Sequence, residues 1–137
     1  MPKSRKSWVY SPPKPLKPRV PEYVKKDLQK KAEELVETVL KPQHIKPPPE
    51  DARFNYLVDI YTKWYRHSLY FCSKYHCPGP NAISPHFEYK FARLEYLGTG
   101  RFNLSFMRHT GKWVQIYTDL TAEQSLAVVR DDPWFDP

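Results

Sequence analysis

Glycine and cysteine are scarce in this chain of 137 residues, which has four glycines and two cysteines. The sequence contains no glycine-rich loop of the kind that cradles a phosphate group, and no serine-centred nucleophile motif. It also lacks a recognisable pair of catalytic carboxylates. We therefore set aside kinase, glycosidase and hydrolase functions.

Long apolar runs are missing as well. No segment approaches the ~20 apolar residues that span a bilayer, and the first residues lack the apolar core of a signal peptide. Cys72 and Cys77 are five positions apart, about 16 Å in an extended strand, which is too far for a disulfide. We expect a soluble cytoplasmic protein with reduced thiols and no membrane partner.

Proline and positive charge concentrate near the N-terminus. Ten of the 15 prolines lie in the first 49 residues, and residues 1–21 carry six basic groups and no acid. Residues 53–112 hold nine basic and three acidic groups, whereas residues 113–137 have a net charge of −4. We predict a disordered or extended Pro-rich basic tail over residues 1–20 and a single domain over 21–137.

Two segments have helical signals. From Pro21, apolar residues recur at helical spacing as far as Leu40, and Lys41-Pro42 is expected to end this helix. Thr121 is a good N-cap with Gln124 three residues on, which predicts a second helix through Arg130.

Between the helices the apolar period becomes two. Alternation predicts five strands, within 55–66, 68–77, 87–97, 101–107 and 112–118, and a change of phase predicts a β-bulge near Ala92-Arg93. The expected fold class is α+β, a five-stranded antiparallel sheet with the N-terminal and C-terminal helices on one face.

Short stretches from residue 54 onward carry a resemblance to a known family. "NAISP", "FARLEY", "MRHTG" and "DDPWF" resemble segments of small bacterial proteins of unknown function. The resemblance covers residues 54–137 and implies one domain and a bacterial source. It supplies no activity.

Period-two alternation also predicts which side chains face away from the helices. Basic and aromatic residues dominate this set, together with His76, His109 and Gln115. Aromatic rings interleaved with cations on an open sheet can stack bases and neutralise phosphates. The main hypothesis is therefore a non-catalytic protein that binds single-stranded nucleic acid, RNA above all. The expected binding residues are Tyr61, Lys63, Tyr65, Tyr70, Lys74, Lys90, Arg93, Trp113 and Tyr117.

Other interpretations of this face stay open. Tyrosine and tryptophan favour strands without binding anything, and the basic-Gly-aromatic motif of the common RNA-binding sheet domain is absent. The face could equally be a protein–protein or homodimer interface, where Tyr, Trp and Arg are enriched.

Chemistry-bearing residues suggest two further hypotheses. Cys72, His76 and Cys77, with His86 across a loop, could bind zinc, but the paired ligand spacing of structural zinc sites is missing, so we expect no metal or other cofactor. A metal-independent, toxin-like ribonuclease would need a general base, a general acid and cations. The candidates for these roles are His109, Arg108, Lys112, Tyr65 and Arg66, if two turns bring them together.

The chain ends in "DDPWFDP", which combines two large aromatic residues with three acids. Two such rings left in water would be an unusual exposed patch. We expect Trp134 and Phe135 to dock on the body of the domain, with the acids facing basic side chains.

Overall fold

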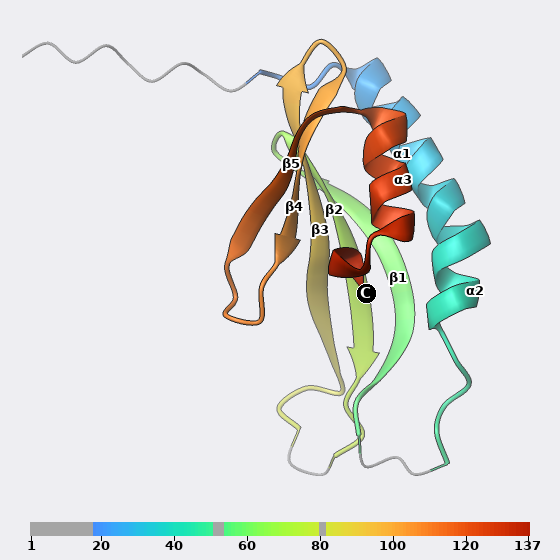
Figure 1. Cartoon of the computed structure of the whole chain (residues 1–137). Helices are drawn as coiled ribbons and strands as arrows, with labels where there is room; N and C mark the ends of the chain where they lie inside the picture. Colours follow the sequence, from blue (N-terminus) through green and yellow to red (C-terminus); the bar gives the residue numbers. More distant parts are fainter. Residues whose placement is uncertain (1–17, 51–53, 80–81) are drawn as a thin grey trace, which may run out of the picture.

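The computed structural model describes residues 18–50, 54–79 and 82–137, so most of the predicted Pro-rich tail lies outside the described residues. The architecture is α+β, as expected, with five antiparallel strands in the order β1-β2-β3-β4-β5. Both long helices cover the same face of the sheet (Figure 1). The strands are β1 Tyr56–Tyr65, β2 Ser68–His76, β3 His86–Gly98, β4 Arg101–Met107 and β5 Trp113–Thr121.

The N-terminal helix runs further than predicted. Helix α1, Glu22–Leu35, continues as a π-helical turn, η2 (Val36–Leu40), and then as α2, Lys41–His44. The Lys41 N–H bonds to the carbonyl of Val36, five residues back, so the hydrogen-bond register shifts just before Pro42. Proline has no N–H to continue an α-helical ladder. The predicted stop at Lys41-Pro42 was therefore wrong, because the wider turn carries the helix past the proline.

The C-terminal helix follows its sequence signals closely. Helix α3 spans Ala122–Asp131 and starts with a capping box, in which the Gln124 N–H donates to the Thr121 side chain and the Gln124 side chain accepts from the Thr121 N–H. Asp132 then caps a short 3₁₀ turn, η3, Pro133–Phe135. Both predicted ends of this helix are confirmed to within one residue.

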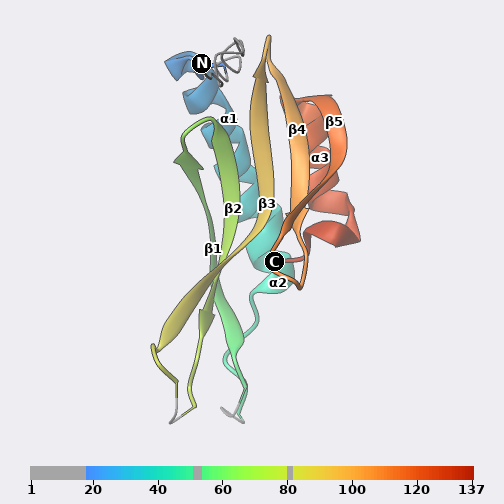
Figure 2. The same cartoon turned by 90° about the vertical axis from the view of Figure 1, so that its left-hand side faces the viewer.

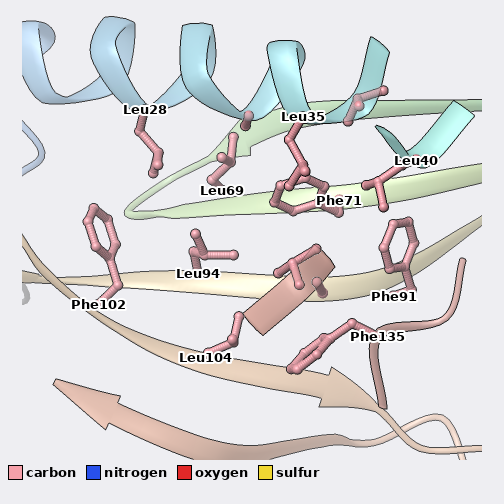
Figure 3. Packing of buried hydrophobic residues seen from close by; sticks show 14 of the residues in the cluster. Leu28, Leu35, Leu40, Leu69, Phe71, Phe91, Leu94, Phe102, Leu104 and Phe135 are labelled. Atoms are coloured by element: carbon pink, nitrogen blue, oxygen red, sulfur yellow. The ribbon is translucent and has the colours of Figure 1, made fainter. Parts of the chain in front are cut away.

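The core lies between the helices and one face of the sheet. Figure 3 shows Leu28, Leu35 and Leu40 pointing from the helix toward Leu69, Phe71 and other side chains of the strands. Val20, next to the predicted domain start at Pro21, is also buried.

Register shifts decide which side chains reach this core. One shift in the pairing of β2 with β3 makes Phe91 the extra residue, next to the bulge predicted at Ala92-Arg93. A second, unpredicted shift makes Val58 the extra residue in β1, so Leu57 packs on the core instead of Tyr56. Tyr56 instead meets His76 on the opposite face, with ring centroids 5.2 Å apart.

The C-terminal segment docks on the helix side of the sheet, but its two aromatic residues differ in how far they are buried. Phe135 is 2% exposed and belongs to the core (Figure 3), whereas Trp134 is 61% exposed and packs its ring against Phe106, with 4.7 Å between ring centroids. The Tyr75 hydroxyl donates to the Pro137 carbonyl at 2.7 Å. Docking is therefore confirmed for Phe135, whereas Trp134 contacts the body at Phe106 but stays largely exposed.

Phe135 and Trp134 form a matched pair for testing this docking. Phe135→Ala should lower the free energy of unfolding by about 3 kcal/mol, because it empties a well-packed site. Trp134→Ala should cost less than about 1 kcal/mol, because most of that ring already contacts water. Chemical denaturation followed by circular dichroism measures both. Equal, small losses in the two variants would show that the C-terminal segment does not complete the core.

Candidate nucleic-acid interface

The face of the sheet opposite the helices, called the open face here, is turned toward the viewer in Figure 2, where the helices lie behind the strands. One row of side chains crosses it strand by strand. Lys63 of β1 pairs with Tyr70 of β2, which pairs with Arg93 of β3. Arg93 in turn pairs with Ser105 of β4, and Ser105 with Gln115 of β5. The alternation predicted from sequence therefore holds across the middle of all five strands.

Aromatic rings and cations contact one another between this row and its neighbours. The Arg93 guanidinium lies over the Trp113 ring, 5.0 Å from its centroid, and the Lys90 ammonium lies 5.5 Å from the centroid of Tyr70. The Tyr70 and Trp113 rings are themselves 5.7 Å apart although they come from β2 and β5. These four side chains, Tyr70, Lys90, Arg93 and Trp113, are called the aromatic–cation cluster below.

Arg93 retains hydrogen-bonding capacity. One of its terminal nitrogens donates a long hydrogen bond, 3.4 Å, to the Ser105 hydroxyl. Its Nε is buried without a hydrogen-bond partner in the described part of the chain, and no carboxylate of those residues pairs with it. A guanidinium with unused donors is suited to an anionic oxygen group such as phosphate.

Glu88 is the partner of most other polar groups at the centre of the open face. Its carboxylate accepts bonds from Lys63 Nζ at 2.8 and 2.9 Å and from the Tyr61 hydroxyl, and Lys90 Nζ lies 3.9 Å away. Burial acts to raise the pKa of Glu88, but the hydrogen bonds from Lys63 and Tyr61 outweigh it, so the pKa lies below the usual value. Burial and then Glu88 raise the pKa of Tyr61. Glu88 therefore stays charged and occupies Lys63 near neutral pH.

The remaining predicted residues lie around this centre. Lys74 stands opposite Glu88 on the neighbouring strand and has no ion pair with a described residue. Tyr65 is 57% exposed at the end of β1, with the Arg66 guanidinium 5.2 Å from its ring centroid. His67 and Glu95 form a pair at the same end, 3.0 Å apart.

Tyr117 is the one predicted binding residue on the wrong face. A register shift in the pairing of β5 with β4, between Gln115 and Tyr117, places it opposite Leu104, a buried core residue. Its hydroxyl donates to the Asp132 carboxylate at 2.6 Å on the helix side. A strict period of two, counted from Trp113, assigns such a residue incorrectly, because each extra residue reverses the face.

The structure does not bring the predicted ribonuclease residues together. Tyr65 and Arg66 lie at the β1–β2 turn, whereas Arg108, His109 and Lys112 lie at the β4–β5 turn. In an antiparallel sheet of this order, the two turns occupy opposite ends of the strands as well as opposite sides of the sheet (Figure 2). The five side chains therefore cannot form one catalytic group within this chain.

Two of the predicted zinc ligands also lie too far apart to bind one metal ion. Cys72 and His76 are four residues apart on one strand, about 13 Å in extended backbone, which is beyond the span of one metal ion. Cys72 is fully buried, and burial raises the pKa of its thiol to about 12. Across residues 18–50, 54–79 and 82–137, no three His, Cys, Asp or Glu side chains are grouped to hold a metal ion.

Glu88 and Ser105 are the residues of this interface that sequence reasoning missed. The signal for Glu88 was present, because it lies two positions before Lys90 and so shares its face. Its role as a shared partner of Lys63 and Tyr61 depends on cross-strand register, which the sequence does not specify.

Comparisons with known proteins give a family and no activity. Among the described residues, no helix is long and apolar enough to cross a membrane. Neither curated proteins nor solved structures provide a match. A family model for a domain of unknown function (DUF3024) matches residues 20–137, which begins at the first buried residue of the packed domain. The chain belongs to this family, DUF3024.

Proposed function

We propose that this protein binds single-stranded nucleic acid, RNA above all, across the open face. The observation that carries the proposal is the aromatic–cation cluster, in which Arg93 and Lys90 lie directly over Trp113 and Tyr70. Proteins that bind single strands combine aromatic stacking surfaces with cations that follow the phosphates. Both elements occur here in neighbouring rows of the open face.

The cations of the open face differ in their availability. Arg93 and Lys74 have no carboxylate partner among the described residues, whereas Lys63 is bonded to Glu88 at 2.8 Å. Phosphate groups would contact Arg93 and Lys74 first. Bases would stack on the exposed Tyr65 ring and on the guanidinium plane of Arg93, since arginine planes stack bases as aromatic rings do.

The expected binding is strongly dependent on salt. Each phosphate contact to a single strand contributes about −0.7 to the slope of log K against log salt, because condensed counterions are released. A labelled single strand of about 12 nucleotides should therefore bind at low salt and weaken steeply as salt is raised. The protein-interface alternative gains support if no binding occurs at either salt concentration.

Lysine substitutions on the two sides of the molecule locate the contact. Lys74→Gln on the open face should lower the salt slope by about 0.7, because one phosphate contact is lost. Lys30→Gln is the matched control, since Lys30 is exposed on the outer surface of α1 and the substitution removes the same charge. Fluorescence anisotropy at several salt concentrations measures both slopes. Equal slopes in the two variants would exclude a contact between phosphate and Lys74.

Glu88→Gln should have the opposite effect. The carboxylate competes with phosphate for Lys63 and Lys90, so its removal frees two cations for the ligand. We expect tighter binding and a salt slope steeper by up to about 1.4. The difference from the wild type should persist from pH 8 to pH 5 and shrink only below the usual carboxylate range, because the pKa of Glu88 is lowered.

Measuring nucleic-acid binding at low pH provides a control for the Glu88→Gln variant. As the pH falls through the lowered pKa of Glu88, the wild-type carboxylate becomes neutral and the two proteins become alike in charge. Weaker binding by Glu88→Gln with an unchanged circular dichroism spectrum would mean that Glu88 organises the interface rather than competing with phosphate.

A further inference from the structure

A histidine–carboxylate pair lies at the β1–β2 turn, at one end of the open face. His67 Nε2 is 3.0 Å from Glu95 Oε2, and the exposed fractions of the two side chains are 23% and 18%. Glu95 lies two residues after Arg93 on β3 and so shares its face. The His67 carbonyl accepts from the Tyr96 N–H at 2.9 Å, so the backbone of the histidine is fixed to β3 as well. The imidazole is therefore held in one place beside the proposed nucleic-acid interface.

The carboxylate determines which ring nitrogen of His67 is basic. A carboxylate only accepts hydrogen bonds, so the neutral imidazole donates from Nε2 and carries its lone pair on Nδ1. Nδ1 forms no hydrogen bond with a described residue, and it is not among the buried unpartnered atoms, so it reaches solvent. A neutral histidine that is held by a carboxylate and has its second nitrogen open is arranged as a general base.

The two residues before His67 supply a cation and an aromatic surface. The Arg66 guanidinium lies 5.2 Å from the centroid of the Tyr65 ring and forms no ion pair with a described residue. Its backbone φ is +57°, a left-handed conformation that is uncommon for a residue with a side chain. Tyr65 is 57% exposed despite the contact with Arg66, so a nucleobase can still pack against its ring. A general base, a cation and a stacking surface therefore come from three consecutive residues.

We propose that the β1–β2 turn cleaves RNA by acid–base chemistry, with His67 as the general base and Glu95 as the residue that positions it. This inference rests on the proposed binding of single strands to the open face. Tyr65 holds a nucleobase, Arg66 meets the adjoining phosphate, and His67 Nδ1 faces the ribose 2′-hydroxyl. The site differs from the ribonuclease group expected from sequence in its histidine, because His109 lies at the other end of the strands.

The cleavage step is a transesterification within the RNA. His67 Nδ1 takes the proton of the 2′-hydroxyl, and the 2′-oxygen forms a bond to the adjacent phosphorus. The bond from phosphorus to the 5′-oxygen of the next nucleotide breaks, and that oxygen takes a proton from water. Arg66 offsets the charge that develops on the phosphate oxygens, and Glu95 stabilises the imidazolium. His67 then returns its proton to solvent, which leaves a 2′,3′-cyclic phosphate and a 5′-hydroxyl end without consuming a co-reactant.

Two histidine variants form a matched pair for testing this assignment. The substrate is a labelled single-stranded RNA of about 12 nucleotides, incubated with a chelator and separated on a denaturing gel. The wild-type protein and His109→Ala should cleave it at the same rate and leave cyclic phosphate ends. His67→Ala should lose at least about 100-fold in kcat, because the general base is gone. Added imidazole should restore part of this loss by replacing the missing base, which a purely structural role of His67 would not allow.

Glu95→Gln tests the positioning role. An amide can donate to Nε2, so the ring no longer keeps its lone pair on Nδ1. We expect kcat to fall by at least about tenfold with KM unchanged, because nucleobase and phosphate contacts stay intact. Thermal midpoints and circular dichroism establish that all variants are folded.

Three results would overturn the proposal: RNA left intact by the wild-type protein, cleavage undiminished in His67→Ala, which would identify a co-purified nuclease, or an equal loss in His109→Ala. A 2′-O-methyl strand of the same sequence has no free 2′-hydroxyl, so it should bind without being cleaved, and its cleavage would contradict this mechanism. Binding of that strand with the RNA left intact overturns cleavage alone. Absence of binding overturns the proposed function as well, so the two failures are distinguishable.

Discussion

In the described part of the chain, helices cover only one face of the five-stranded sheet, and most features of this molecule depend on that one-sided packing. The covered face is apolar and is filled by Leu28, Leu69, Leu94 and similar side chains, with Phe135 from the chain end completing it. Burying one face of an antiparallel sheet fixes the register of every strand, because a slip by one residue would expose the core. The same constraint fixes which side chains form the open face.

Polar and aromatic groups on the open face contact one another, and no helix of the described residues covers them. Glu88 holds Lys63 and Tyr61, while Arg93 and Lys90 lie over the rings of Trp113 and Tyr70. Such contacts cost little to break, because exposed ion pairs contribute at most about 1 kcal/mol each. Under the proposed function, a polyanionic ligand would replace Glu88 as the partner of Lys63 and Lys90 without disturbing the core.

The helices and strands could be predicted from the sequence because the sequence signals for each element are local. Helical spacing, the Thr121 cap and strand alternation each depend on neighbouring residues, so the number, type and order of the elements were predictable. The errors arose where one residue is added to a regular element. The extra residues at Val58 and in β5, and the wider helical turn before Pro42, change which way the following side chains point. Only the change of phase in β3 was visible as a break in apolar alternation.

The candidate sites were predictable to a lesser degree. Eight of the nine predicted binding residues share the open face. Lys90 and Arg93 do so across the bulge at Phe91, which the change of phase predicted, whereas Tyr117 follows a bulge that was not predicted. The separation of Arg66 from His109 depends on the order of the strands, and the pairing of His67 with Glu95 depends on cross-strand register. These are properties of tertiary arrangement, which periodicity and composition do not contain.

The most direct measurement is an amide-resolved nuclear magnetic resonance titration of isotope-labelled protein with a short uridine oligonucleotide. If the open face is the binding surface, the largest shifts should occur at Tyr70, Arg93 and Ser105, the central row of the sheet, with little change in α1 and α3. Shifts confined to the two helices or to residues 1–17, or no shifts at all at low salt, would contradict the central claim that the open face binds single strands.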